Sequence, residues 1–312
     1  MVTVLNLFYG ALGILLLYYG AEFLVKGGVK IAYRFKISPL VVGLTLVAFG
    51  TSAPELVVSI DSALKGLGNI SIGNVVGSNI CNIALILGLC SMITPLNVNK
   101  QLFRLDVPLM IISAVVLSIF CIAGSGVNRW QGAVFFAGII AYTVYSIRFA
   151  GKNDSNSEDV PENSGSLLLA VLLVAGGLAA LICGSKLFVN SAVYIAKLLK
   201  ISDAVIGLTV VAVGTSLPEL ATSVVAAIRG EKDIAIGNVV GSNTFNILAI
   251  CGIAPLVAPI SCPGISMVDM VMMLAVSGLL WIMMKTGLSI SRKEGALLFL
   301  IYCGYTVYLL VG

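Results

Sequence analysis

The chain has 312 residues, of which 59% are hydrophobic and only 10% are charged, and its formal net charge is +4. Soluble domains carry about 25% charged residues, so the composition excludes an ordinary soluble domain and indicates a polytopic membrane protein. Histidine is absent, which excludes His-based zinc sites, Ser-His hydrolase chemistry and histidine proton relays. No basic cluster is dense enough to predict nucleic-acid binding.

Hydropathy predicts ten membrane spans of about 20 residues each, the length that a hydrocarbon core of about 30 Å requires. The first apolar run starts near Leu5 without a basic segment before it or a small-residue cleavage site, so we expect a retained helix and not a signal peptide. The expected fold class is therefore all-α. The predicted spans lie near residues 4–25, 38–64, 70–93, 105–123, 129–149, 167–189, 202–228, 234–257, 264–285 and 292–311.

The only long polar segment, residues 151–166, separates the fifth and sixth spans. Its four acidic residues could bind calcium, but a solvated cytoplasmic linker is the better interpretation, and the segment is too short to form a regulatory domain. The seven cysteines are scattered without a CxxC spacing, so we expect them to pack in the interior and not to form disulfides or bind metal.

The linker separates two copies of one unit, residues 1–150 and 167–312. An offset of 164 residues aligns the segment Gly50-Thr51-Ser52-Ala53-Pro54-Glu55 with Gly214-Thr215-Ser216-Leu217-Pro218-Glu219. The same offset aligns the GNVVGSN run at residues 73–79 with the identical run at 237–243. More than half of the positions from 37 to 83 are identical across the offset, which shared hydrophobicity does not explain.

Five spans per copy is an odd number, so the second copy should enter the membrane from the opposite side. This predicts two inverted-topology five-helix repeats with a site near the membrane midplane, where broken helices of the two repeats meet. Alternate loops hold 13 Lys and Arg residues on one side and 5 on the other. By the positive-inside rule both termini face outward.

Each duplicated motif places a carboxylate, two hydroxyls and a proline inside an apolar span. Proline removes a backbone donor, so the carbonyls of Gly50 and Gly214 should be free of helical hydrogen bonds. Thr51, Ser52 and Glu55 share one helical face, as Asn74, Ser78 and Asn82 do on the next span. Carboxylate, hydroxyl, amide and carbonyl oxygens are the ligands of hard cations such as Ca²⁺ and Na⁺. Two carboxylates neutralise one Ca²⁺, and competition of Na⁺ for the same oxygens would produce antiport.

Several of these residues have simpler roles. Hydroxyls in membrane helices often bond their own backbone, and Gly73/Gly77 and Gly237/Gly241 have the spacing of close helix packing. Asn79 and Asn243 lie off the polar stripe and are expected only to bond across helices. Asp61 is expected to be a surface acid near a helix end. Glu55 and Glu219 have no such alternative, because no basic residue lies in the central turns of their spans.

The motifs GTSxPE and GNxxGSNxxN, each present twice, resemble the α-repeats of the sodium/calcium exchanger family of the cation/Ca²⁺ antiporter superfamily. The resemblance in architecture covers the whole chain, with the repeat motifs at about residues 41–83 and 205–247. It implies ten helices, alternating access, and Ca²⁺ extrusion driven by inward Na⁺. The large cytoplasmic regulatory domains found in the family are missing here.

Carried over by position, the resemblance implies twelve ligand residues, six from each repeat. They are Glu55, Thr51, Ser52, Ser78, Asn82 and the Ala48 carbonyl, with Glu219, Thr215, Ser216, Ser242, Asn246 and the Ala212 carbonyl. Some relatives, including potassium-dependent ones, carry Asp where this chain has Asn246. Since both stripe asparagines are neutral, we expect exchange that is independent of K⁺. The resemblance also suggests that three Na⁺ replace one Ca²⁺, which would make the exchange electrogenic.

We therefore predict a Na⁺/Ca²⁺ antiporter of the plasma membrane and not an enzyme. Its expected partners are Ca²⁺, Na⁺ and the lipid bilayer, with no further cofactor, no nucleic acid and no obligate protein partner. The nearest alternative is a H⁺/Ca²⁺ antiporter of the same superfamily, although protons need no hydroxyl cage. A passive cation channel is a second alternative, and an intramembrane hydrolase fails for lack of a Ser-His dyad.

Overall fold

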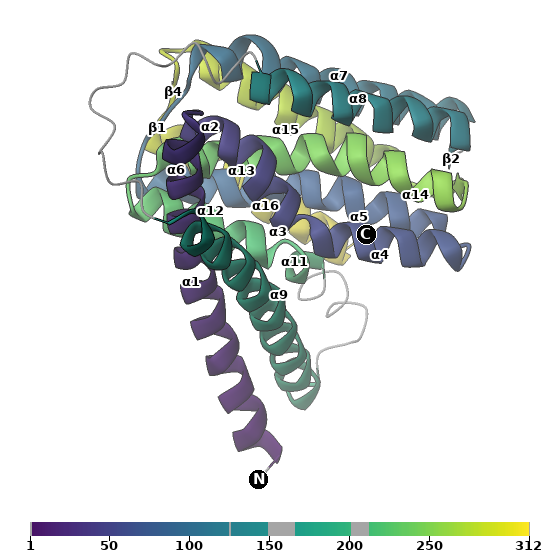
Figure 1. Cartoon of the computed structure of the whole chain (residues 1–312). Coiled ribbons are helices and arrows are strands. Elements are labelled where there is room, and N and C mark those ends of the chain that lie inside the picture. Colours follow the sequence, from purple (N-terminus) through teal and green to yellow (C-terminus); the bar gives the residue numbers. More distant parts are fainter. Residues whose placement is uncertain (1, 125, 149–165, 201–211, 312) are drawn as a thin grey trace.

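The computed structural model of the chain describes residues 2–124, 126–148, 166–200 and 212–311, which are almost entirely helical (Figure 1). Within these residues eight helices are long and apolar enough to cross a membrane. A ninth span is the pair Pro39–Thr51 and Ala53–Leu64, bent by 46°. The helix Leu217–Ile228 is apolar but shorter. Part of the predicted span 202–228 lies outside the described residues, so the count of ten stays a prediction.

In the first half of the chain, π-helical segments (η) interrupt several spans. Ser38 accepts a hydrogen bond from the Val41 amide and begins the second span, with Pro39 in its first turn. The helices are α1 (Val2–Phe35), α2 (Pro39–Val42), η1 (Gly43–Val47), α3 (Ala48–Thr51), α4 (Ala53–Leu64), α5 (Gly68–Ile80), η2 (Cys81–Leu87), α6 (Gly88–Ile93), η3 (Leu102–Asp106), α7 (Val107–Gly124) and α8 (Arg129–Arg148).

The second half repeats the pattern of long spans with a break before the motif proline. Its helices are α9 (Leu167–Leu198), α11 (Ala212–Gly214), α12 (Leu217–Ile228), α13 (Lys232–Phe245), η6 (Asn246–Ile250), α14 (Cys251–Val257), α15 (Met267–Lys285) and α16 (Arg292–Val311).

Four two-residue strands connect the loops of the two halves. Strand β1 (Leu96–Asn97) pairs antiparallel with β4 (Ser289–Ile290), and β2 (Gly126–Val127) pairs antiparallel with β3 (Ile260–Ser261). Each pair joins one strand from each half, so the ends of the helical bundle are tied across the repeat boundary.

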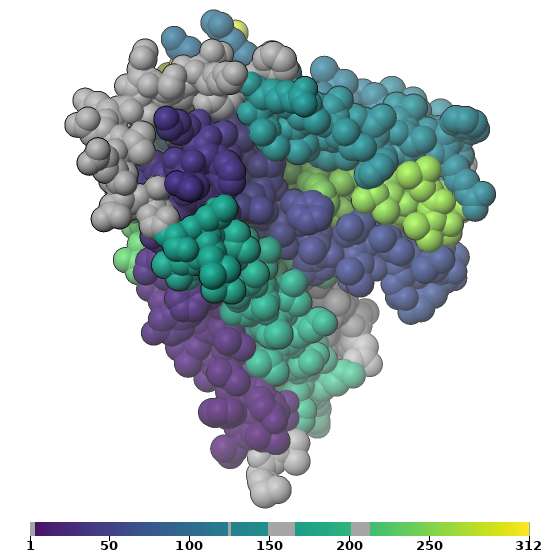
Figure 2. All heavy atoms as spheres, in the orientation of Figure 1, coloured from purple at the N-terminus to yellow at the C-terminus, as the bar shows by residue number. Residues whose placement is uncertain are grey.

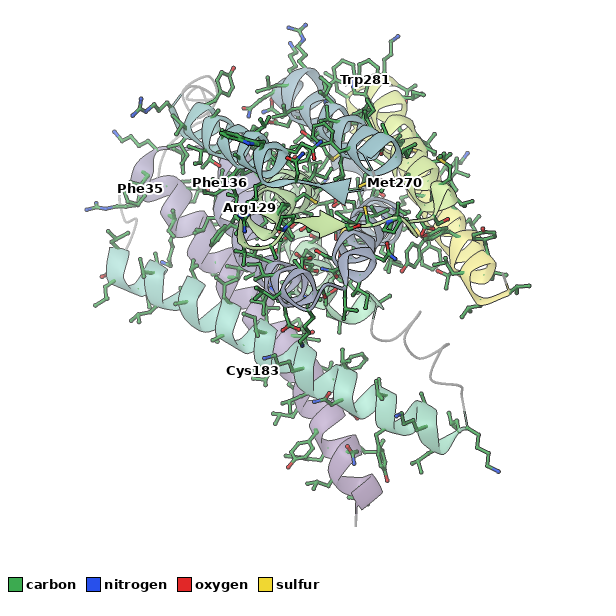
Figure 3. The ribbon with its side chains drawn as sticks, turned by 90° about the vertical axis from the view of Figure 1, so that its right-hand side faces the viewer. Phe35, Arg129, Phe136, Cys183, Met270 and Trp281 are labelled. Atoms are coloured by element: carbon green, nitrogen blue, oxygen red, sulfur yellow. The ribbon has the colours of Figure 1, made fainter. Side chains whose placement is uncertain are left out.

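Helices α1 and α9 lie side by side and project from the remaining helices (Figure 1), and Figure 2 shows the same pair at the lower end of the molecule. In the view turned by 90° they cross one another, with Cys183 on α9 (Figure 3). Glycines allow the close approach. A Cβ atom at Gly20 would lie 2.9 Å from the Gly177 carbonyl oxygen, and one at Gly13 would lie 2.8 Å from that of Gly184.

The predicted packing roles are confirmed in part. A Cβ at Gly237 or Gly241 would lie within 3 Å of backbone oxygens of the second span, so these glycines do permit close packing. At Gly73 and Gly77 an added Cβ would meet no atom of the described residues within 4 Å. The repeat offset assigns their partners to residues 201–211, outside the described part. All seven cysteines are free, and five of them are buried as predicted, whereas Cys183 and Cys303 are exposed.

Candidate ion-binding site

The two motif segments form matching breaks in their helices. Ser52 separates α3 from α4 with φ −83° and ψ 6°, and Ser216 precedes α12 with φ −86° and ψ 8°. Pro54 and Pro218 lie in the first turns that follow, where a missing N–H costs nothing. Glu55 and Glu219 therefore stand in the first turns of α4 and α12, and the unpaired amides of a helix start favour a negative charge.

The carboxylates of the two repeats are bonded crosswise. The Ser52 hydroxyl donates to Oε1 of Glu219 at 2.8 Å, and the Ser216 hydroxyl donates to Oε1 of Glu55 at 3.2 Å. Both glutamates and both serines are buried. Spacing places Ser52 and Glu55 on one helical face, and the structure adds that the Ser52 hydroxyl turns toward the carboxylate of the other repeat.

Five buried oxygen atoms of the predicted ligand set have no hydrogen-bond partner among the described residues. They account for more than half of the nine such buried side-chain atoms in the described part. An unpaired buried oxygen costs free energy, so a group of them calls for a bound species. The five atoms are Glu55 Oε2, Glu219 Oε2, Asn82 Oδ1, Asn246 Oδ1 and Ser242 Oγ.

Asparagine pairs orient the amide groups of this cluster. Asn82 donates through Nδ2 to Oδ1 of Asn243 at 3.0 Å, and Asn246 donates through Nδ2 to Oδ1 of Asn79 at 3.2 Å. These bonds occupy the amide nitrogens of Asn82 and Asn246 and leave their Oδ1 atoms without a partner among the described residues. Asn79 and Asn243 do bond across helices as predicted, and the structure adds their role in orienting the ligand amides.

A second asparagine pair holds the motif helices to their neighbours. Asn74 donates to the Glu55 carbonyl at 3.2 Å, and Asn238 donates to the Glu219 carbonyl at 3.4 Å. Asn238 also accepts a 3.1 Å hydrogen bond from the Thr51 hydroxyl. Thr51 therefore points toward the second repeat, as Ser52 does.

The carbonyl groups at the breaks differ between the repeats. The Ala48 carbonyl accepts the Ser52 amide at 3.0 Å and the Thr51 hydroxyl at 3.4 Å. The Gly214 carbonyl has no helical donor, because Pro218 follows one turn later, but it accepts the Ser185 hydroxyl of α9 at 2.6 Å. The prediction that Gly214 escapes helical bonding holds, yet its oxygen is already bonded. Ala212 begins α11, and Thr215 is only partly buried.

The structure thus brings the side chains of Glu55, Glu219, Ser52 and Ser216 together. On the neighbouring helical segments, Asn82, Asn246 and Ser242 also have buried side-chain oxygens without a partner among the described residues. In the described part no basic side chain forms an ion pair with either glutamate, and no group of three or more His, Cys, Asp or Glu residues could hold a metal ion. Two carboxylates among neutral oxygens suit hard cations and not soft transition metals.

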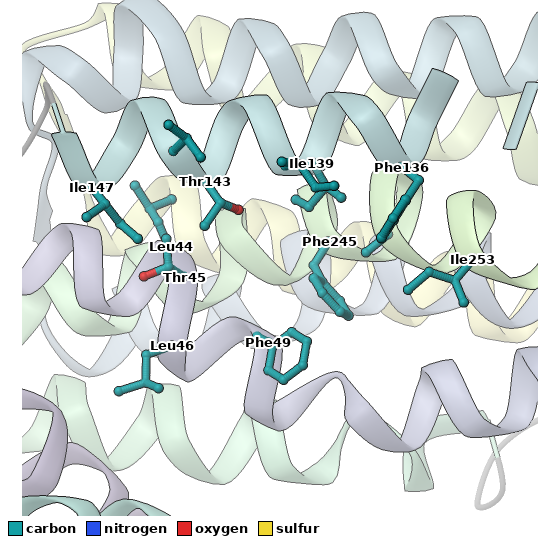
Figure 4. Close-up of a pocket in the computed structure, with 13 residues that line it drawn as sticks. Leu44, Thr45, Leu46, Phe49, Phe136, Ile139, Thr143, Ile147, Phe245 and Ile253 are labelled. Atoms are coloured by element: carbon teal, nitrogen blue, oxygen red, sulfur yellow. The ribbon is translucent and has the colours of Figure 1, made fainter. Parts of the chain in front are cut away.

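An apolar groove of about 500 Å³ lies next to the first break but is separate from the polar cluster. Figure 4 shows Phe49, Phe136, Phe245 and Ile253 on its wall. Phe49 packs edge-on against Phe245 with ring centroids 5.1 Å apart. Among the described residues of its lining, Thr45 and Thr143 are the only ones that bear a hydroxyl, and none is charged.

Comparison with known proteins gives consistent matches over the full chain. The family profile described as Sodium/calcium exchanger protein matches residues 5–148 and 169–311. The sodium/calcium exchanger MaX1 of Methanosarcina acetivorans is 35% identical over 99% of both chains. The inner membrane protein YrbG of Escherichia coli is 34% identical over 79% of this chain and 78% of its own. A solved structure of the sodium-calcium exchanger NCX_Mj has a TM-score of 0.86 at 34% identity, covering 98% of this chain and 99% of that one.

Proposed function

The chain belongs to the sodium/calcium exchanger protein family, a family of membrane antiporters for these two ions, and we propose that it extrudes Ca²⁺ in exchange for Na⁺ by alternating access. The observation that carries this proposal is the buried cluster of Glu55, Glu219, Asn82, Asn246 and Ser242 with five unpartnered oxygens. The two carboxylates match the charge of one Ca²⁺, and Na⁺ ions compete for the same oxygens.

We assign the transported ions to the twelve predicted ligands, which we call the cage. Thr51 and Ser52 contribute hydroxyls from the first break, and Thr215 and Ser216 from the second. Ser78 and Ser242 contribute from the neighbouring helices, and Ala48 and Ala212 contribute carbonyls. If three Na⁺ exchange for one Ca²⁺, each cycle moves one net charge, so exchange is electrogenic. With Asn at positions 82 and 246 the cage has no third carboxylate to balance a co-bound K⁺.

The proposed architecture is ten spans in two inverted five-helix repeats, residues 1–150 and 167–312, joined by a cytoplasmic linker at 151–166. Three features support it. The offset of 164 maps Gly13 onto Gly177 and Gly20 onto Gly184. It therefore converts the close contact Gly13–Gly184 into the close contact Gly20–Gly177. Two Asp–Tyr hydrogen bonds, Tyr142 to Asp106 and Tyr305 to Asp269, recur at an offset of 163. Strands β1 and β3 begin 164 residues apart, so the pair β1–β4 corresponds to β3–β2.

We place this multi-pass protein in the plasma membrane with both termini outside, as the distribution of basic residues favours. The test of function is calcium uptake into proteoliposomes that contain the purified full-length protein, under imposed Na⁺, K⁺ or H⁺ gradients. Uptake driven by an outward Na⁺ gradient alone is expected. Uptake driven by a proton gradient without Na⁺ would contradict Na⁺ coupling. Calcium that moves only down its own concentration gradient, under every imposed gradient, would indicate a channel.

A further inference from the structure

A buried acid outside the cage connects α1 to α12. Glu22 of α1 is 5% exposed, and its carboxylate binds two cations. Lys26, one turn along α1, lies 2.9 Å from Oε1. Arg229, which directly follows α12, reaches Oε1 with one terminal nitrogen at 2.8 Å and Oε2 with Nε at 2.9 Å. A buried acid within a membrane span is a functional candidate, and paired Arg–carboxylate bonds fix geometry.

The packing around this Glu22 cluster (Glu22, Lys26 and Arg229) is not matched in the other half. Helix α1 packs along α12, whereas the described residues show no comparable packing of α9 on α4. Among the described residues, the α1–α9 pair therefore packs along the motif helix of the second repeat and has no comparable packing along that of the first.

The repeat offset shows which residues would meet if the pair covered the other side instead. Adding 164 to Glu22 gives Lys186 on α9, and subtracting 164 from Arg229 gives Lys65 at the end of α4. Lys65 binds Asp61, one turn before it, at 2.6 Å. Asp61 and Lys65 thus repeat on α4 the acid–lysine pair that Glu22 and Lys26 form on α1. Asp61 is an exposed acid as predicted.

Lys186 is exposed, and no ion pair involves it among the described residues. If it approached Lys65 alone, the two ammonium groups would repel. The Asp61 carboxylate would supply the negative charge between the two ammonium groups, just as the Glu22 carboxylate does between Lys26 and Arg229. Each cluster then contains one acid and two bases, with the acid bridging its own lysine and a cation from the other repeat.

We propose that Asp61 and Lys186 form the counterpart of the Glu22–Arg229 ion pair in the oppositely facing state, so that the two ion pairs form alternately during transport. This inference rests on the proposed antiport by alternating access, in which one bundle rocks against the other around a fixed site. Helices α1 and α9 move together in this scheme, because glycine contacts hold them to one another.

The first test reverses charges in the full-length protein in proteoliposomes. Lys186→Glu should slow Na⁺-driven Ca²⁺ exchange by about fivefold and leave the Ca²⁺ affinity measured by calorimetry unchanged. Adding Asp61→Lys to that variant should restore about half of the wild-type rate or more. If wild-type protein exchanges but Lys186→Glu is as fast, or the double variant is not restored, the paired role is wrong. Absence of exchange in the wild type would instead refute the proposed function.

The second test measures proximity. Asp61→Cys and Lys186→Cys are introduced with the exposed Cys183 and Cys303 replaced by Ser, and the rate of cross-linking by a short bis-maleimide is followed. Arg229→Gln breaks the ion pair with Glu22 and should raise this rate about fivefold. A merely structural role for Arg229 would leave the rate unchanged, and that result would overturn the proposed alternation.

Discussion

The hydroxyl of Ser52 donates a 2.8 Å hydrogen bond to the carboxylate of Glu219, a residue 167 positions further along the chain. Ser216 and Glu55 make the reciprocal bond at 3.2 Å. Each broken helix thus supplies a donor to the acid of the other, which fixes the distance between the two breaks.

Neutralising either acid should abolish calcium exchange. A divalent ion in a buried site needs its charge matched, and leaving a buried charge without its partner costs about 3–5 kcal/mol. Glu55→Gln or Glu219→Gln is therefore expected to reduce Na⁺-driven ⁴⁵Ca²⁺ uptake to background while the protein remains folded in detergent. Glu231→Gln, a change in the loop before α13, is the matched control. Wild-type exchange in either cage variant would show that the two-carboxylate site is wrong.

Removing one crossed hydroxyl should weaken calcium binding without abolishing it. Ser52→Ala leaves Oε1 of Glu219 without its donor, and a hydrogen bond to a charged group contributes about 1.5–3 kcal/mol. The apparent Ca²⁺ affinity in calorimetry should fall about tenfold or more, and Ser216→Ala should act in the same way. Ser113→Ala removes a buried hydroxyl that bonds its own helix at Leu109, and it should bind calcium normally. Equal affinity in all three variants would contradict the crossed arrangement.

Exchange should not require potassium. Asn82 and Asn246 are neutral, so the cage has two formal negative charges and none to compensate a bound K⁺. Na⁺-driven calcium flux is expected to be the same with K⁺ on both sides or with choline in its place. Asn246→Asp adds a charge and should change ion selectivity, most simply by slowing turnover through tighter cation binding. A strict need for K⁺ in the wild type would refute the charge count.

Equivalent residues of the two repeats should lie on opposite sides of the membrane. Leu64 and Ile228 are 164 residues apart, each ends its motif helix, and their exposed fractions are 62% and 63%. With Cys183 and Cys303 replaced by Ser, a membrane-impermeant maleimide added to intact cells should label Leu64→Cys and not Ile228→Cys. Equal labelling in intact cells would rule out the inverted topology.

A methyl group at the α1–α9 contact should destabilise the protein. At Gly177 an added Cβ would lie 2.7 Å from the carbonyl oxygen of Gly20, which cannot move independently of its helix. Gly177→Ala should lower the free energy of unfolding by about 1–3 kcal/mol. An added Cβ at the neighbouring Gly176 would meet no atom of the described residues within 4 Å, so Gly176→Ala is the control. Thermal unfolding in detergent compares the two, and equal midpoints would contradict the tight contact.

Much of the site could be predicted from sequence, because the motif is duplicated and its residues are expensive to bury. Glu55 and Glu219 were identified by the cost of a carboxylate in an apolar span, and the structure brings both into one buried cluster. The stripe asparagines were identified by spacing alone. Their buried Oδ1 atoms without a partner among the described residues agree with the predicted ligand role.

The long-range partners could not be predicted. Spacing along one helix relates Ser52 to Glu55, but the break turns Ser52 toward Glu219, and only the tertiary arrangement reveals this. The same holds for Asn79 and Asn243, whose role depends on amides 161 to 167 residues away. The π-helical segments at Cys81 and Asn246 were also missed, since residues of ordinary helix propensity form them.

The crossed serine–glutamate bonds have a consequence for the origin of the chain. In one repeat alone, the glutamate would lack the serine that donates to it, and the serine would lack the glutamate that accepts from it. A complete cage from a single repeat requires a second copy inserted in the opposite orientation, as in a dimer of upside-down subunits. On the proposed topology, the present chain is such an antiparallel dimer made permanent by fusion. Once the copies were joined, each position could diverge independently, and equivalent positions could acquire opposite charges, as Glu22 and Lys186 have.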